Sequence, residues 1–188
     1  AVRRQRVAVE PAEPDGLGAQ AQRLHDVRPA REAAIDPDLG AAGDGHKMKL
    51  LMNFCAMGYA SIYSEALAVA KKAGLTPQQV DSGLRGSRMD CGFYQTFFSY
   101  VLDRNREAHK FTLNNAHKDM KYLAAMAQAA GVANPVGGAV KNYYAMAVAA
   151  GRGEDYVPML SDFVAELNGV ALAGGKKQAA ELGALLPH

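Results

Sequence analysis

From Gly43 onward, apolar and polar residues alternate with the period of an α-helix. Residues Met48 to Ala73 contain no proline and one interior glycine, Gly58, and their apolar side chains fall on nearly every face of a helix. A helix this apolar is typical of the centre of a bundle. At a rise of ~1.5 Å per residue it would be roughly 39 Å long. The pattern therefore predicts one long central helix.

Shorter helices are predicted after the long one from local start and stop signals. Gly74 is placed to end the long helix, and Thr76, Pro77 and Gln79 match a capping box that opens a helix to about Leu84. The others are expected over 92–102, from a cap at Asn114 or Asn115 to Gly131, from Asn134-Pro135 to near Gly151, and over 156–167. Because no segment there alternates like a half-buried strand, we predict an all-α helical bundle.

The first 42 residues differ in kind from the rest. They hold six arginines, no lysine and no aromatic residue, and four of the eight prolines. They show no sustained helical period; residues 7–9 and 20–27 are candidates for a short strand and a short helix. Residues 16–21 fit GxGxxA, but no hydrophobic strand leads into them, as a dinucleotide-binding turn requires. We divide the chain into an irregular segment, 1–42, a helical domain, 43–170, and a tail, 171–188.

Composition and charge exclude several functional classes. The chain has 188 residues, of which 49% are hydrophobic, and its 21 basic and 19 acidic side chains nearly balance. This balance argues against a nucleic-acid-binding or polybasic membrane module. The longest apolar stretch, between Lys49 and Glu65, is too short to span a membrane.

Cys55 and Cys91 lack zinc or disulfide spacing, so we expect a reducing, cytoplasmic compartment. No P-loop motif is present.

The first candidate for chemistry is GDGHKMKLLMN, residues 43 to 53. Gly43 and Gly45 suit a backbone that turns tightly or approaches a ligand closely. Lys49 follows near the start of the long helix, and Asn53 lies four residues later on the same face. A lysine at that position suits a general acid or base. The alternative interpretation is an ordinary solvated lysine.

The second candidate is FTLNNAHKDMKYLA, residues 111 to 124, in which Phe111 precedes a helix that carries Lys118 and Asp119. By spacing alone, this pair is equally an ordinary surface ion pair on an amphipathic helix. The histidines give no metal site, because a metal needs at least three convergent ligands and the sequence shows none.

Several stretches together resemble the β-hydroxyacid dehydrogenases, the family that includes 3-hydroxyisobutyrate dehydrogenase and related semialdehyde reductases. GDGHKMKLLMN is similar to the family's GxGxxxKxxxN segment. SEALAVAKKAGL (64–75), HKDMKYLAAMAQAAGVANPV (117–136) and GRGEDYVPML (151–160) are similar to further family segments in the same order. The resemblance covers residues 40 to 170.

The resemblance implies a fold and a set of roles. The helical part would correspond to an all-α domain like the C-terminal domain of 6-phosphogluconate dehydrogenase. Because helical domains with such an apolar long helix usually dimerise or pack against a second domain, we also expect a homo-oligomer. Lys49 would be the catalytic lysine, with Asn53, Gly43 and Gly45 on the substrate. Phe111, Lys118 and Asp119 would line the cofactor end of the cleft, and NAD or NADP would carry the hydride to or from a short 3-hydroxy acid or semialdehyde.

The family's nucleotide-binding domain has no counterpart in this sequence, because 42 residues cannot form a six-stranded nucleotide fold. Residues 1–42 are a remnant or a replacement of that domain, and we expect no dehydrogenase turnover from this chain alone. Two other functions remain open. One is a non-catalytic helical dimerisation scaffold, and the other is a helical bundle that binds an acyl chain or similar ligand.

Overall fold

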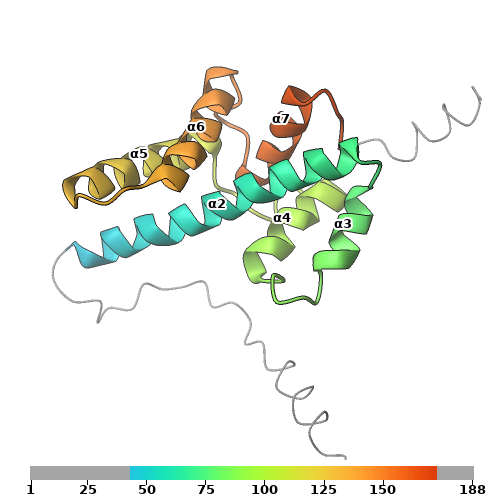
Figure 1. The fold of residues 1–188 in the computed structure, drawn as a ribbon, viewed down its shortest axis with the longest axis horizontal. Helices are drawn as coiled ribbons and strands as arrows, with labels where there is room; N and C mark the ends of the chain where they lie inside the picture. The colour runs from blue at the N-terminus through green and yellow to red at the C-terminus, as the bar shows by residue number, and fades with distance from the viewer. Residues whose placement is uncertain (1–42, 173–188) are drawn as a thin grey trace, which may run out of the picture. The chain divides into compact units, whose positions relative to one another are not determined.

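A computed structural model describes residues 43–172, which form six α-helices, a 3-10 turn and no strand (Figure 1). The elements are α2 (Asp44–Lys72), α3 (Pro77–Leu84), α4 (Gly92–Asp103), α5 (Leu113–Ala129), α6 (Pro135–Ala149), η1 (Val157–Met159) and α7 (Leu160–Leu167). The predicted all-α fold with one long helix is confirmed. The predictions for residues 1–42, including the strand, the helix and the GxGxxA match, and for most of the tail, 173–188, lie outside the described residues.

The long helix α2 begins four residues earlier than the sequence pattern predicted. Gly43 is its N-cap with φ of 101°, a left-handed conformation that glycine adopts without steric cost. The carbonyl of Gly43 accepts the first helical bond, from the Lys47 N–H at 3.1 Å. Asp44 stabilises this end because a carboxylate interacts favourably with the positive end of the helix dipole. Gly45 therefore lies inside the first turn, and Lys49 in the second.

The end of α2 and the start of α3 follow the predicted signals. Gly74 has φ of 86°, and the N–H groups of Gly74 and Leu75 donate to the carbonyls of Lys71 and Ala70 in a Schellman motif. The Thr76 side chain then accepts from the Gln79 N–H, while the Gln79 side chain accepts from the Thr76 N–H. The predicted capping box is therefore confirmed.

The starts of α5 and α7 differ from the prediction. Thr112, and not Asn114 or Asn115, caps α5, because its side chain accepts from the Asn115 N–H. Residues 157–159 form a 3-10 turn before α7, so the α-helix begins at Leu160 and not at Tyr156. Both differences have one origin: Thr112 and Tyr156 are held in extended conformation as an isolated antiparallel bridge, which local sequence patterns do not reveal.

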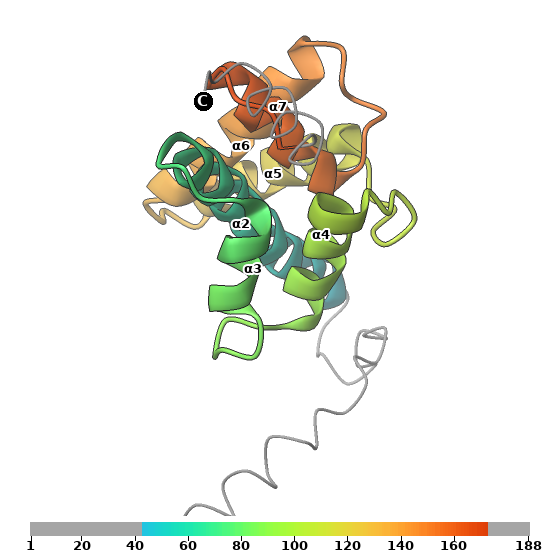
Figure 2. The same cartoon turned by 90° about the vertical axis from the view of Figure 1, so that its right-hand side faces the viewer.

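The remaining helices pack around α2 (Figures 1 and 2). The helices α5 and α6 lie along its N-terminal and middle parts, with α5 antiparallel to it, while α3, α4 and α7 lie towards its C-terminal end. Tyr63 of α2 packs its ring against those of Tyr94, Phe97 and Phe98 in α4, with centroids 5.4 to 5.9 Å apart. Burial of these aromatic side chains contributes much of the stability of the core.

One face of α2 is not buried, although a helix this apolar is typical of the centre of a bundle. Met48, Met52, Tyr59, Ile62 and Val69 expose between 37% and 68% of their surface. A periodic pattern identifies the apolar positions of a helix, but it does not show which other element packs against them.

None of α2–α7 combines the length and the hydropathy that a membrane-spanning helix requires.

Candidate active site

Three polar side chains from α2 and α5 meet at the N-terminal part of α2. The Asn53 amide Nδ2 donates to Asp119 Oδ2 at 2.7 Å. Lys49 Nζ lies 3.4 Å from the same carboxylate oxygen. Lys49 and Asn53 therefore lie on one face of α2, as their spacing of four residues predicts. The partner that joins them comes from a helix far along the chain.

The two charged side chains differ sharply in exposure. The Asp119 side chain is 3% exposed, whereas that of Lys49 is 47% exposed. A buried carboxylate is costly unless cations or hydrogen-bond donors compensate it, and both partners of Asp119 do so. The alternative interpretation of Lys118 and Asp119 as a surface ion pair is wrong, because Asp119 is buried and bonded to α2. The arrangement places one ammonium group at the edge of solvent with its direction set by a fixed anion.

The position of Asp119 depends on how the start of α5 is held. The Leu113 and Asn114 N–H groups donate to the carbonyls of Asp155 and Gly153 at 2.8 and 2.9 Å. The Val157 N–H donates to the carbonyl of Phe111 at 2.9 Å. The GRGEDYVPML stretch therefore anchors the first turn of α5, two turns before Asp119. The sequence alone marked this stretch only by family resemblance and did not indicate this contact.

The other predicted site residues do not join this cluster. Lys118 is exposed and donates weakly to Asn115 Oδ1 at 3.5 Å, and its side chain leaves α5 about 100° away from that of Asp119. Phe111 is half-buried and packs against the hydrophobic core. Gly43 caps α2 and Gly45 lies in its first turn, close to Lys49 along the chain. The structure thus brings together Lys49, Asn53 and Asp119, with the two glycines at the same end of α2.

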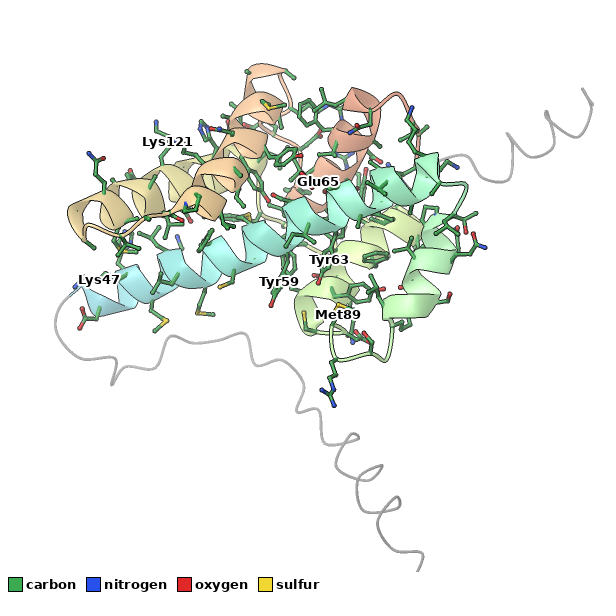
Figure 3. The ribbon with its side chains drawn as sticks, in the orientation of Figure 1. Lys47, Tyr59, Tyr63, Glu65, Met89 and Lys121 are labelled. Carbon is green, nitrogen blue, oxygen red and sulfur yellow. The ribbon has the colours of Figure 1, made fainter. Side chains whose placement is uncertain are left out.

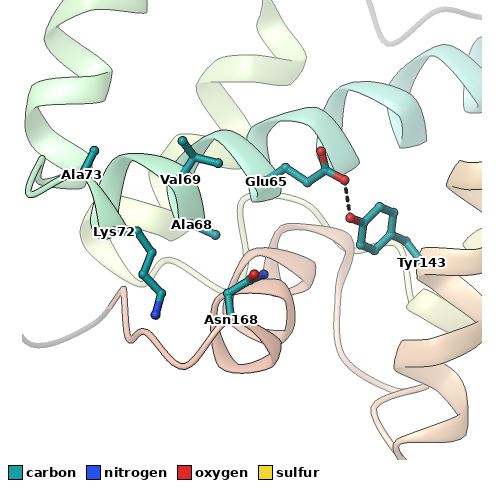
Figure 4. A pocket seen from close by; sticks show the side chains of 7 residues that line it. All are labelled: Glu65, Ala68, Val69, Lys72, Ala73, Tyr143 and Asn168. Atoms are coloured by element: carbon teal, nitrogen blue, oxygen red, sulfur yellow. Dashed lines mark hydrogen bonds between the residues drawn. The ribbon is translucent and has the colours of Figure 1, made fainter.

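A cavity of about 510 Å³ lies at the other end of α2, lined by Glu65, Lys72, Tyr143 and Asn168 among others (Figure 4). The Tyr143 hydroxyl donates to the Glu65 carboxylate. A second cavity of about 180 Å³ shares Glu65 and Tyr143. Glu65 is about 24 Å along the helix from Lys49, given the rise per residue. These cavities are therefore separate from the Lys49 cluster.

Three histidines, His46, His109 and His117, lie in the part of the chain that the structure describes. Among residues 43–172, no group of three or more His, Cys, Asp or Glu side chains is placed to hold a metal ion. His109 packs edge-on against Phe93, and its Nε2 is buried without a hydrogen-bond partner. Burial lowers the pKa of His109. Burial, followed by the charges of Lys121 and Lys141, lowers the pKa of His117.

We expect acid to destabilise the protein through His109. The unfolded chain binds a proton on this histidine below about pH 6.5, whereas the folded chain resists protonation to a lower pH. The free energy of unfolding therefore falls as the pH drops through about 6.5 towards the lowered folded pKa. Urea unfolding of His109→Phe between pH 7.5 and 5 should show a weaker decline than the parent. The exposed His46→Gln variant is the control, and an unchanged decline in His109→Phe would contradict this role.

The helical part of the chain matches a known family. Residues 43–161 match the family model described as "NAD-binding of NADP-dependent 3-hydroxyisobutyrate dehydrogenase". This match covers more than half of the chain. The chain belongs to this family. Among curated proteins, none matches the sequence.

Solved structures of 3-hydroxyisobutyrate dehydrogenases share the fold of this family member. That of Salmonella typhimurium is 19% identical, with a TM-score of 0.59 over 64% of this chain and 42% of that one. That of Mycobacterium tuberculosis, in a structure with L-serine, is 21% identical, with a TM-score of 0.59 over 67% of this chain and 45% of that one. The chain therefore spans less than half the length of these proteins.

The described residues of this family member place two polar groups beside Asp119 at the edge of solvent. Lys49 offers an accessible ammonium, and Asn53 a fixed amide, beside which a carbonyl or hydroxyl group can lie. Residues 43–172 contain no strand and so no strand–turn–helix unit of the kind that binds a pyrophosphate.

Proposed function

We propose that residues 43–170 are the catalytic helical domain of an NAD- or NADP-dependent dehydrogenase acting on short 3-hydroxy acids or the corresponding semialdehydes. The observation that supports this most is the shared carboxylate oxygen of Asp119, which receives both the Lys49 ammonium and the Asn53 amide. Family membership supports the reaction class. The domain boundaries at 42 and 170 belong to the same proposal.

Lys49 is the proton donor in this proposal. As a carbonyl is reduced, negative charge develops on its oxygen, and the ammonium stabilises that charge and transfers its proton to the oxygen. In the direction of oxidation the neutral amine removes the proton from the hydroxyl group. The bound nicotinamide supplies or accepts the hydride. The 47% exposure of the Lys49 side chain supports access of a substrate to this group.

Asn53 orients the substrate. Its Nδ2 donates one hydrogen to Asp119, which leaves a second N–H donor and the acceptor Oδ1 for a substrate. That oxygen accepts a hydrogen bond from the substrate hydroxyl and so holds the reacting carbon next to Lys49. Asp119 is a positioning residue here, in place of the cofactor-binding role that the resemblance implies. The roles of Phe111 and Lys118 at the cofactor, and of Gly43 and Gly45 near the substrate, remain family-based proposals.

The assembly and location belong to the same proposal. We expect a homo-oligomer, and the two free cysteines, Cys55 and Cys91, are typical of the reducing cytoplasm. The second candidate function is a non-catalytic scaffold, which the exposed apolar face of α2 favours.

Completing the nucleotide site tests the dehydrogenase proposal. We expect the 188-residue chain alone to show no turnover, and a fusion carrying the nucleotide-binding domain of the Salmonella typhimurium relative ahead of Gly43 to form reduced nucleotide from short 3-hydroxy acids. L-serine, present with the Mycobacterium tuberculosis relative, belongs in the substrate panel. A fusion that melts cooperatively and binds nucleotide but oxidises no substrate would support the scaffold instead.

A further inference from the structure

Two adjoining cavities lie between α2 and the helices α6 and α7, in a region that the proposed chemistry does not use. The larger has about 510 Å³, a volume typical of a small-molecule site, and the smaller has about 180 Å³. Glu65 and Tyr143 line both cavities, so we call the two together the Glu65 groove. Figure 3 shows Glu65 on the side of α2 towards α6 and α7, and Tyr59 on another side, where it packs against Phe93 of α4.

The Glu65 carboxylate is the anionic group of this groove. The Tyr143 hydroxyl donates to it, and this hydrogen bond together with burial raises the pKa of Tyr143 to about 12. Tyrosine therefore stays neutral at ordinary pH and the carboxylate keeps its negative charge. Within residues 43–172 no cation pairs with Glu65. A carboxylate beside a phenol oxygen offers only acceptors to a ligand, which suits an ammonium group.

Lys72 supplies the opposite charge at the other end of the larger cavity (Figure 4). Its spacing of seven residues from Glu65 places both on one face of α2, about 10 Å apart along the helix. Lys72 has no ion-pair partner among the residues that the structure describes. Asn168 Nδ2 donates one hydrogen to the Val164 carbonyl at 2.8 Å, which leaves its second N–H for a ligand. An ammonium group near an amide N–H suits a carboxylate.

The smaller cavity adds an apolar compartment beside Glu65. Apart from Glu65, Tyr143 and Ser61, its lining is apolar and consists of Gly58, Ile62, Val136, Ala139 and Val140. The Ser61 hydroxyl already donates to the Met57 carbonyl at 3.0 Å. An aliphatic group that enters this compartment gains the free energy of leaving water. Because the compartment adjoins Glu65 and not Lys72, that group must be attached close to the ammonium end of the ligand.

We infer that the Glu65 groove binds a short peptide with free termini, about three residues long, whose first side chain is aliphatic. Three extended residues span roughly 10 Å, which matches the spacing of Glu65 and Lys72. The terminal ammonium lies at Glu65 and Tyr143, the first side chain enters the smaller cavity, and the terminal carboxylate lies at Lys72. A single amino acid is too short to reach both charges. The inference does not depend on the proposed dehydrogenase activity, because Glu65 is about 24 Å along α2 from Lys49.

NMR titration of the 188-residue chain with the peptide Leu-Gly-Gly tests this site. Saturable amide shifts are expected within residues 58–73 and 136–143 and at Asn168, and none around Lys49. The N-acetylated peptide and the C-terminal amide each lack one terminal charge, so each should bind about 10-fold more weakly. Gly-Gly-Leu should also bind more weakly than Leu-Gly-Gly, because its side chain is at the wrong end, and leucine alone should bind more weakly than either charge-complete peptide.

Single substitutions assign each end of the peptide. Glu65→Gln should raise the Kd for Leu-Gly-Gly about 10-fold and abolish the discrimination against the acetylated form, and Lys72→Met should do the same for the amide. The matched controls are Glu107→Gln and Lys121→Met, which change exposed charges outside the groove and should keep the parent's Kd. Thermal melts of all four variants should match the parent, because these side chains are exposed.

Ala139→Leu tests the apolar compartment. Ala139 is exposed on α6, so the larger side chain should fill the smaller cavity without disturbing the fold. Leu-Gly-Gly should then bind more weakly while Gly-Gly-Gly binds as it does to the parent. Absence of saturable shifts with millimolar Leu-Gly-Gly would overturn the inference, as would equal binding of the acetylated or amidated peptide. Either result would leave the Lys49-dependent turnover of the fusion unchanged, so the two proposals fail separately.

Discussion

Replacing Lys49 with methionine should lower kcat/KM on the order of 10² to 10⁴-fold in the fusion with a nucleotide-binding domain. Methionine keeps the apolar stem but removes the ammonium, so the developing alkoxide loses both its counter-charge and its proton source. Nucleotide binding should change little, because in the proposed mechanism Lys49 contacts the substrate oxygen and not the nucleotide. The measurement is steady-state turnover with the best hydroxy-acid substrate, together with nucleotide titration by fluorescence.

Lys47 provides the matched control for this experiment. It lies two residues before Lys49 on the same helix, is 63% exposed and pairs with Asp44 at 2.9 Å. Lys47→Met should keep turnover within about two-fold of the parent, as a surface change away from the site. Methylamine added to Lys49→Ala should restore part of the lost rate. Near-parent turnover in Lys49→Met would exclude the lysine as the general acid.

Replacing Asp119 with asparagine should lower kcat roughly 10 to 10²-fold while leaving the KM for nucleotide unchanged. The substitution keeps the shape of the side chain but removes the charge that holds the Lys49 ammonium 3.4 Å away and fixes the Asn53 amide. A catalytic group that moves by about 1 Å can lose on this order of rate. Kinetics with nucleotide and substrate varied separately would measure both constants.

The separation of the two constants decides between two roles for Asp119. If the residue contacts the cofactor, as the family resemblance implies, the KM for nucleotide should rise and kcat should hold. If it positions Lys49 and Asn53, only kcat should fall. Asp103→Asn, at the exposed end of α4, controls for a general change in charge. A thermal melt of each variant separates lost catalysis from lost folding.

The local features of this fold could be predicted from sequence because their causes lie within a few residues. The capping box at Thr76 and Gln79 needs only two side chains three positions apart, and the Schellman end of α2 needs a glycine at position 74. The face shared by Lys49 and Asn53 follows in the same way from a spacing of one helical turn.

The predictions that were wrong depended on distant partners. Thr112, and not Asn114 or Asn115, caps α5 because the bridge to Tyr156 holds the preceding chain extended. Apolar side chains on nearly every face of α2 indicated a helix at the centre of a bundle, yet several of them between Met48 and Val69 are exposed. A short stretch of sequence does not show which faces of its helix another helix will contact.

By itself, the sequence determined an all-α domain from Gly43 onward with a long helix that presents Lys49 and Asn53 on one side, because helix geometry and capping are set by near neighbours. Only the tertiary structure decided that Asp119 is buried between them and that Lys118 stays in solvent. The physical reason is that a carboxylate can remain charged and buried only where donors from another helix compensate it. Those donors come from α2, 66 residues away in the case of Asn53, and only packing brings them together.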